Sequence, residues 1–133
     1  MKSLIGVLVG LVILLLASSC ATVSKKPLAP GEVRLLSIDV LGGGIKGNSS
    51  FAVNIFFEAA DSADIKRACF YGPGEGPYCF DVRYATFGTK RALQVQIPGI
   101  KPGSYWAECY AEYVRDGEIQ KTNVIATQIL VGP

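Results

Sequence analysis

The sequence predicts an all-β domain folded as a β-sandwich, and three observations support this class. Short runs of residues alternate between apolar and polar side chains, which is the pattern of half-buried strands. Each run ends in glycine, proline or polar residues, at a spacing suited to a sandwich. No segment of helix length shows a helical period, and 59–66 (AADSADIK) is long enough for one turn at most.

The strands are expected where this alternation is clearest. The first is 33–41 (VRLLSIDVL), with Leu36, Ile38 and Val40 on one face. Three later runs are expected to place these residues on their apolar faces: Phe51, Val53, Ile55 and Phe57; Phe80, Val82 and Tyr84; Leu93, Val95 and Ile97. Successive side chains of a strand point to opposite faces, so these residues are the predicted core.

A tight hairpin turn is predicted at Asp116-Gly117, between 113–115 (YVR) and 118–119 (EI). Asp-Gly supplies the positive φ angles that a type I′ turn requires. The pairing around this turn sets Glu112 opposite Lys121, and we expect the two side chains to form a cross-strand ion pair.

A second turn, 98–105 (PGIKPGSY), leads into the expected penultimate strand. A Lys-Pro-Gly-x-Tyr turn at this place resembles bacterial immunoglobulin-like and fibronectin type III-like domains. The resemblance implies a single immunoglobulin-like β-sandwich of about seven antiparallel strands over 32–133. It also implies a tyrosine corner, in which the Tyr105 hydroxyl bonds back to the upstream backbone. The chain departs from antibody domains, whose second strand carries a cysteine.

The N-terminus has the order of a secretory signal peptide. Lys2 precedes an unbroken apolar run, 4–17. This run is shorter than the ~20 residues that a membrane-spanning helix needs. Two lysines beyond it, Lys25 and Lys26, also disfavour a permanent anchor with its N-terminus in the cytoplasm. We therefore expect the segment to be cleaved.

The residues that follow, Ala17-Ser18-Ser19-Cys20, resemble the lipobox of bacterial lipoproteins. The resemblance implies that Cys20 is joined to diacylglycerol and becomes the first residue, carrying acyl chains such as palmitate. Ala21 in place of Asp resembles the outer-membrane destination, facing the periplasm. The expected organisation is a signal peptide at 1–19, a lipidated tether at 20–31 and one domain at 32–133.

Composition excludes several functions. The chain has no histidine, which removes Ser-His-Asp and Cys-His catalysis and the commonest metal ligand. Its net charge is +2, with no basic stripe, so nucleic acid is not an expected partner. No cofactor motif is present either. The glycine-rich 42–47 (GGGIKG) matches a dinucleotide fingerprint only formally, because 51–57 (FAVNIFF) after it predicts a strand instead of a helix.

Three cysteines remain beyond Cys20, and export would place them in an oxidising compartment. A hairpin centred on Gly74 sets Cys69 opposite Cys79, which favours a bridge between them. The alternative is Cys69–Cys109, because strands C and F are neighbours in an immunoglobulin-like sheet. The spacings match no zinc pattern, so no metal site is expected.

Two aromatic surfaces are candidate partner sites. The hairpin 69–79 (CFYGPGEGPYC) would present Phe70, Tyr71 and Tyr78 on a rigid loop. If the penultimate strand points Tyr105, Ala107, Cys109 and Ala111 inward, its outer face carries Trp106, Tyr110 and Val114, joined by Ile119 and Ile125. The opposite phase, with Trp106 toward the core, remains open.

These features predict a lipid-anchored, non-enzymatic binding or accessory module that contacts a protein partner in the cell envelope. The alternative is a carbohydrate- or cell-wall-binding module, since exposed Trp and Tyr also stack on sugar rings. An enzyme is not expected. The available carboxylates have no partner at catalytic spacing: Asp61, Asp64, Glu108 and Glu112. On a strand, Glu108 and Glu112 lie about 13 Å apart, too far for a glycosidase pair.

Overall fold

The computed structural model describes residues 26–40, 44–60, 63–72 and 76–133. The expected signal peptide, Cys20, Asp61 and Gly74 lie outside these ranges. Gly42 and Gly43 of the glycine-rich loop also lie outside them. None of the described residues forms a helix long and apolar enough to cross a membrane.

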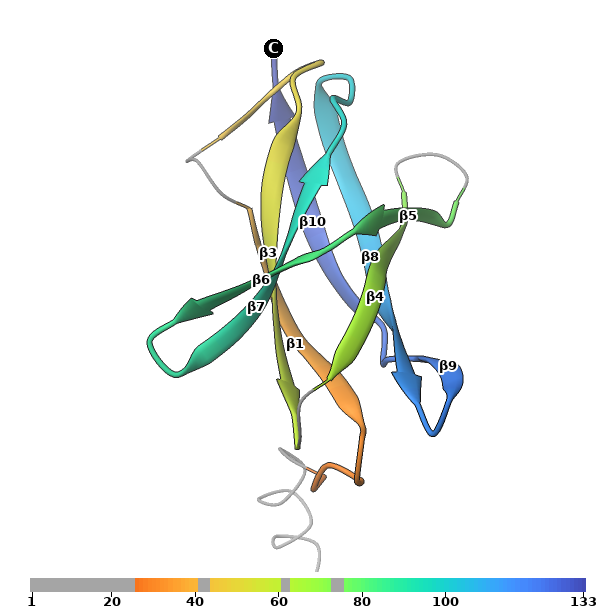
Figure 1. The fold of residues 1–133 in the computed structure, drawn as a ribbon. Helices are drawn as coiled ribbons and strands as arrows, with labels where there is room; N and C mark the ends of the chain where they lie inside the picture. Colours follow the sequence, from red (N-terminus) through yellow and green to blue (C-terminus); the bar gives the residue numbers. More distant parts are fainter. Residues whose placement is uncertain (1–25, 41–43, 61–62, 73–75) are drawn as a thin grey trace, which may run out of the picture.

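The described chain is all-β, as predicted, and forms ten strands (Figure 1). Their bounds are β1 Val33–Val40, β2 Ile45–Lys46, β3 Phe51–Ala59, β4 Asp64–Tyr71, β5 Tyr78–Asp81, β6 Arg83–Phe87, β7 Lys90–Ile97, β8 Gly103–Arg115, β9 Glu118–Lys121 and β10 Ile125–Gly132. The expectation of about seven strands was too low. The extra pairings come from β2, β5 and β9, which have two to four residues each and are too short to show an alternating pattern.

The strands form two sheets. The first has the order β1-β3-β7-β6, and the second has the order β2-β10-β8-β4-β5, with β9 attached to β8. All pairs are antiparallel except β2 with β10, which is parallel. Between β5 and β6 the chain crosses from the second sheet to the first (Figure 1). Buried side chains of both sheets share one hydrophobic cluster, so the arrangement is compatible with a sandwich.

The predicted core faces of β3 and β7 are confirmed. Phe51, Val53, Ile55 and Phe57 are buried, and so are Leu93 and Val95. The prediction for the first strand is partly wrong. A β-bulge between Leu35 and Ser37 inserts one residue, which moves Leu36 outward and buries Leu35. Ile38 and Val40, beyond the bulge, pack against the core as expected.

Both predicted turns are present. Asp116 and Gly117 have φ angles of 53° and 77°, as a type I′ turn requires. The register that sets Glu112 opposite Lys121 is confirmed. The expected ion pair between them is replaced, because the Glu112 carboxylate contacts Arg67 at 3.1 Å. The Tyr105 hydroxyl donates a 2.7 Å hydrogen bond to the backbone oxygen of Lys101, as predicted.

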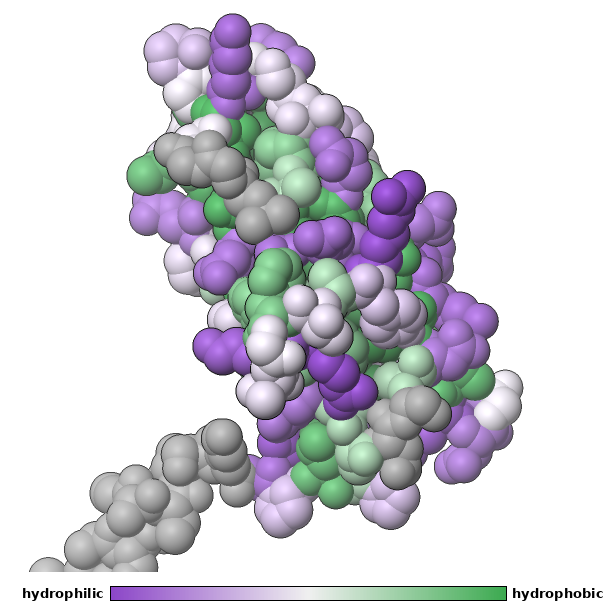
Figure 2. Space-filling view, turned by 60° about the vertical axis from the view of Figure 1, so that its left-hand side comes forward, coloured by the Kyte–Doolittle hydropathy of each residue, from purple (hydrophilic) through white to green (hydrophobic). Residues whose placement is uncertain are grey.

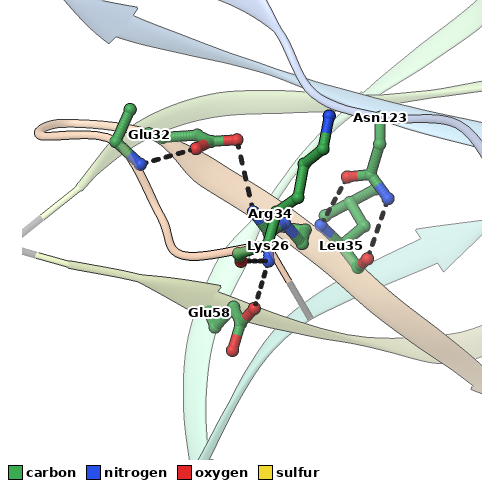
Figure 3. A network of polar contacts seen from close by, with 7 residues as sticks. Lys26, Glu32, Arg34, Leu35, Glu58 and Asn123 are labelled. Carbon is green, nitrogen blue, oxygen red and sulfur yellow. Dashed lines mark hydrogen bonds and ion pairs between the residues drawn. The ribbon is translucent and has the colours of Figure 1, made fainter. Parts of the chain in front are cut away.

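The start of the described chain is fastened to β1 by Arg34 (Figure 3). Its Nη1 donates to the Lys26 backbone oxygen at 2.6 Å and to Glu58 Oε1 at 3.2 Å. Glu32 accepts from the backbone of Ala29 at 2.7 Å, which closes the turn before the strand. The chain therefore enters the fold at the lower end of the view in Figure 1, where β1 begins.

The surface seen in Figure 2 mixes hydrophobic and hydrophilic residues, with no continuous apolar band on that side. No single apolar patch of the described residues on that side of the molecule therefore marks a candidate site.

Candidate functional site

The β4–β5 hairpin is stapled by a disulfide between Cys69 and Cys79, which confirms the favoured pairing. The two residues are direct cross-strand partners, with Cα atoms 4.0 Å apart. The alternative bridge from Cys69 to Cys109 is wrong. Cys109 is a free cysteine in the core, where burial raises the pKa of its thiol to about 12.

The aromatic residues of this hairpin divide between its two faces. Phe70 pairs with Tyr78, and both point toward the first sheet, whereas the disulfide lies on the outer side. Phe70 is 6% exposed and belongs to the core cluster. The expectation that it presents itself to a partner is therefore corrected. Tyr78 is exposed at the end of the hairpin, and Tyr71 is exposed on the outer face.

The outer face of β8 carries the exposed tryptophan, so the first of the two predicted phases is right. Trp106 is 65% exposed, while Ala107, Cys109 and Ala111 point into the core. Ile119 lies on this outer face, opposite Val114. Ile125 does not, because it pairs with Cys109 and packs on the core side of β10. The break between β9 and β10 shifts the alternation of side chains by one position relative to a continuous strand. Ile125 therefore faces the core and not the outer face.

Tyr110 also lies on the outer face, but it is only 5% exposed and is not an accessible contact residue. The ring of Tyr71 lies 6.1 Å from its ring, and Lys121 Nζ lies over it at 5.1 Å. These neighbours cover the tyrosine, which the single-strand pattern could not show. The expected surface thus loses both Phe70 and Tyr110.

On the outer face of β10, an exposed apolar residue was missed from the sequence. Leu130 on β10 is 65% exposed, and it is the outward neighbour of Gln128, which pairs with Trp106. The run 129–131 (ILV) is apolar throughout, so its sequence gives no sign of which residue faces outward. We call the surface formed by Tyr71, Trp106 and Leu130 the Trp106 face.

Polar groups are interleaved with the apolar side chains of the Trp106 face. Gln128 pairs with Trp106 and Ser104 pairs with Leu130, and Gln128 Nε2 donates to Ser104 Oγ at 2.9 Å between the two apolar side chains. Glu108 pairs with Tyr71 across β4 and β8. Exposed aromatic residues together with hydrogen-bonding groups have the composition of a protein contact surface.

The acidic residues make structural contacts. Glu112 accepts two hydrogen bonds from Arg67, at 3.1 and 3.4 Å. Asp64 forms a 2.9 Å ion pair with Lys66. Ligand atoms of Cys69, Cys79 and Glu112 lie within 4.8 Å of one another. The two sulfurs are bonded to each other, however, so neither offers the thiolate that a metal would need.

Comparison of the chain with protein-family models gives no match, and comparison with curated proteins gives none either. Function must therefore be inferred from the residues and their arrangement.

Proposed function

We propose that this chain is a lipid-anchored, non-enzymatic module of the bacterial cell envelope that binds a protein partner through the Trp106 face. The observation that carries the proposal is the exposure of Trp106 on β8 and Leu130 on β10, which are diagonal neighbours on the central strands of the second sheet. Tryptophan is enriched in the contact centres of protein interfaces.

The proposed fold family is immunoglobulin-like. In constant-type domains, strands A, B, E and D form one sheet and strands C, F and G form the other. If β1, β3, β4, β6, β7, β8 and β10 are strands A, B, C, D, E, F and G, both sheet orders agree with this scheme. The hydrogen bond from Tyr105 to Lys101 adds support, since it has the form of a tyrosine corner.

The proposed location follows from the N-terminal residues. Ala17-Ser18-Ser19-Cys20 resembles a lipobox, and two or three acyl chains would hold the protein on a bilayer. Ala21 after the cysteine favours the outer membrane, with the domain in the periplasm. The fastening of Lys26 to Arg34 is compatible with a short tether entering the fold at the start of β1.

A glycan is the second candidate partner. Gln128, Ser104 and Glu108 lie around an exposed tryptophan, and such polar groups can hydrogen-bond the hydroxyls of a sugar that stacks on the ring. Binding to purified peptidoglycan, lost on Trp106→Ala, would favour this candidate over a protein partner.

The test is cross-linking in intact cells with the full-length chain, after its intact mass has been checked for a start at Cys20 with acyl chains attached. Trp106→Ala combined with Leu130→Ala is expected to abolish the cross-linked partner. Leu36→Ala is the matched control, because Leu36 is an exposed leucine on the first sheet and should leave the partner bound. Equal loss in the control, or retention in the double variant, would remove the Trp106 face as the binding surface.

A further inference from the structure

An apolar cavity of about 240 Å³ lies between the two sheets. The first sheet contributes Phe51, Val53 and Ile97 to its wall, and the second contributes Phe70, Phe80 and Ile129. The loop 98–100 completes it. Its lining includes residues at the start of β3 and at the end of β7. These ends of the two strands lie in the upper half of Figure 1, away from the start of β1.

The lining of this cavity suits a hydrocarbon and not water. None of the described residues around it is charged, and its one polar side chain is Tyr78. A buried water needs two to four polar partners, and a cavity with aliphatic and aromatic walls does not supply them. The space opens to the surface, so its apolar lining is exposed to solvent unless a ligand covers it.

The size of the cavity narrows the class of occupant. A dry cavity of roughly 150 Å³ is enough to hold benzene. This cavity is larger and runs between aliphatic residues of both sheets, so a single ring would leave part of it empty. A flexible alkyl chain can fill such a space more completely.

A lysine next to the lining loop suits an acidic head group. Lys101 is exposed and directly follows the lining loop 98–100. The backbone N–H of Asn48 donates to the Ile100 oxygen at 2.7 Å, which brings the segment after Lys46 beside the same loop. The Tyr78 hydroxyl, on a half-exposed side chain, can donate a further hydrogen bond.

We propose that this cavity binds the alkyl chain of a fatty acid, with its carboxylate at the surface beside Lys101. The proposal does not rest on the function of the Trp106 face. Trp106 points outward from the second sheet, whereas Phe70 and Ile129 point into the cavity.

The test is photolabelling of the full-length protein in membranes. The probe is a fatty acid with a diazirine in its alkyl chain and a terminal alkyne, and the labelled peptides are identified by mass spectrometry. Labels are expected within 51–53, 70–72, 78–80 or 97–100, and excess unlabelled palmitate is expected to prevent labelling.

Two aliphatic residues give a matched pair of variants. Ile129→Phe fills the cavity and should lower the labelling about tenfold, equivalent to ~1.4 kcal/mol of binding free energy. Leu36→Phe adds similar bulk at an exposed position of the first sheet and should leave the labelling unchanged. Lys101→Glu leaves the core intact and should raise the palmitate concentration needed for competition several-fold. Lys90→Glu, on the first sheet, is its control.

Three results would overturn the proposal. Labels on the outer face of β8 or on the N-terminal segment would place the fatty acid elsewhere. A failure of palmitate to compete, with Lys101→Glu also without effect, would exclude this ligand. Labelling that arises only after Cys20→Ser would assign the cavity to the lipid of the chain itself.

Discussion

The two faces of β8 differ in a way that is opposite to the usual arrangement of a sheet. Its inward side chains include Ala107, Cys109 and Ala111, all small and fully buried. Its outward side carries Trp106, which is largely exposed. The bulk that fills the interior comes mainly from the opposite sheet, where Ile55 and Leu93 are among the largest fully buried side chains.

This difference teaches that side-chain size on one strand does not reveal its buried face. Small inward residues let the second sheet fit against the large side chains of the first, at ordinary interior density. The large outward residues then have no role in the core. Under the proposed function, the exposed Trp106 contacts a partner outside the domain instead.

The largest expected effect tests which sheet supplies the core. Ile55→Ala removes a fully buried side chain of β3 and should lower the free energy of unfolding by about 2–5 kcal/mol. Leu130→Ala on the outer face should change it by no more than about 0.5 kcal/mol. Urea unfolding followed by circular dichroism measures both, and equal losses would contradict the assignment of faces.

The next effect concerns the Cys69–Cys79 disulfide on the outer side of the second sheet. The residues of the disulfide are 10 apart in sequence, so its loss should lower the free energy of unfolding by about 2–3 kcal/mol in the chain-entropy model. The Cys69→Ala, Cys79→Ala double variant measures this loss by urea unfolding under non-reducing conditions. Reductant should destabilise the wild-type protein by a similar amount and leave the double variant unaffected. If reductant does not destabilise the wild-type protein, the bridge does not stabilise the hairpin.

The smallest effect concerns the buried Cys109, whose contribution to the free energy of unfolding depends on pH. Burial raises the pKa of the Cys109 thiol from 9.0 to about 12, so the unfolded chain loses this proton at lower pH than the folded one. The contribution of the thiol to stability is complete below pH 9 and falls as the pH rises toward 12. Between pH 9 and pH 10, the wild-type protein should lose about 1 kcal/mol more than Cys109→Ala. Parallel pH profiles for the two proteins would mean that the thiol is accessible in the folded state.

Much of the fold could be predicted because alternation and turn chemistry act locally. The faces of β3 and β7 and the Asp116-Gly117 turn were expected from neighbouring residues. The Tyr105 hydrogen bond was expected from the resemblance of its turn to immunoglobulin-like domains. The errors arose where one inserted residue changes the phase. The bulge after Leu35 moved Leu36 outward, and the break between β9 and β10 moved Ile125 inward.

The candidate site was less predictable, because accessibility depends on strands that are distant in the sequence. Tyr110 has the right phase for a surface residue, yet Tyr71 and Lys121 cover it. The apolar cavity draws on both sheets and on the loop 98–100, so no single segment indicates it. The Cys69–Cys79 disulfide was favoured over its alternative because both cysteines belong to one hairpin, whose turn sets them opposite each other.

The Asn123 side chain affects how readily one copy of the domain can pair with the edge strand of another. Its side-chain oxygen accepts from the Leu35 N–H at 2.8 Å, and its Nδ2 donates to the Leu35 oxygen at 3.0 Å (Figure 3). β1 is an edge strand of its sheet, and free backbone groups on an edge are a template for strand addition by another chain. The amide occupies two of these groups beside the bulge, where the edge is already irregular. On this side, the Asn123 amide therefore protects the domain from edge-to-edge aggregation with other copies of itself.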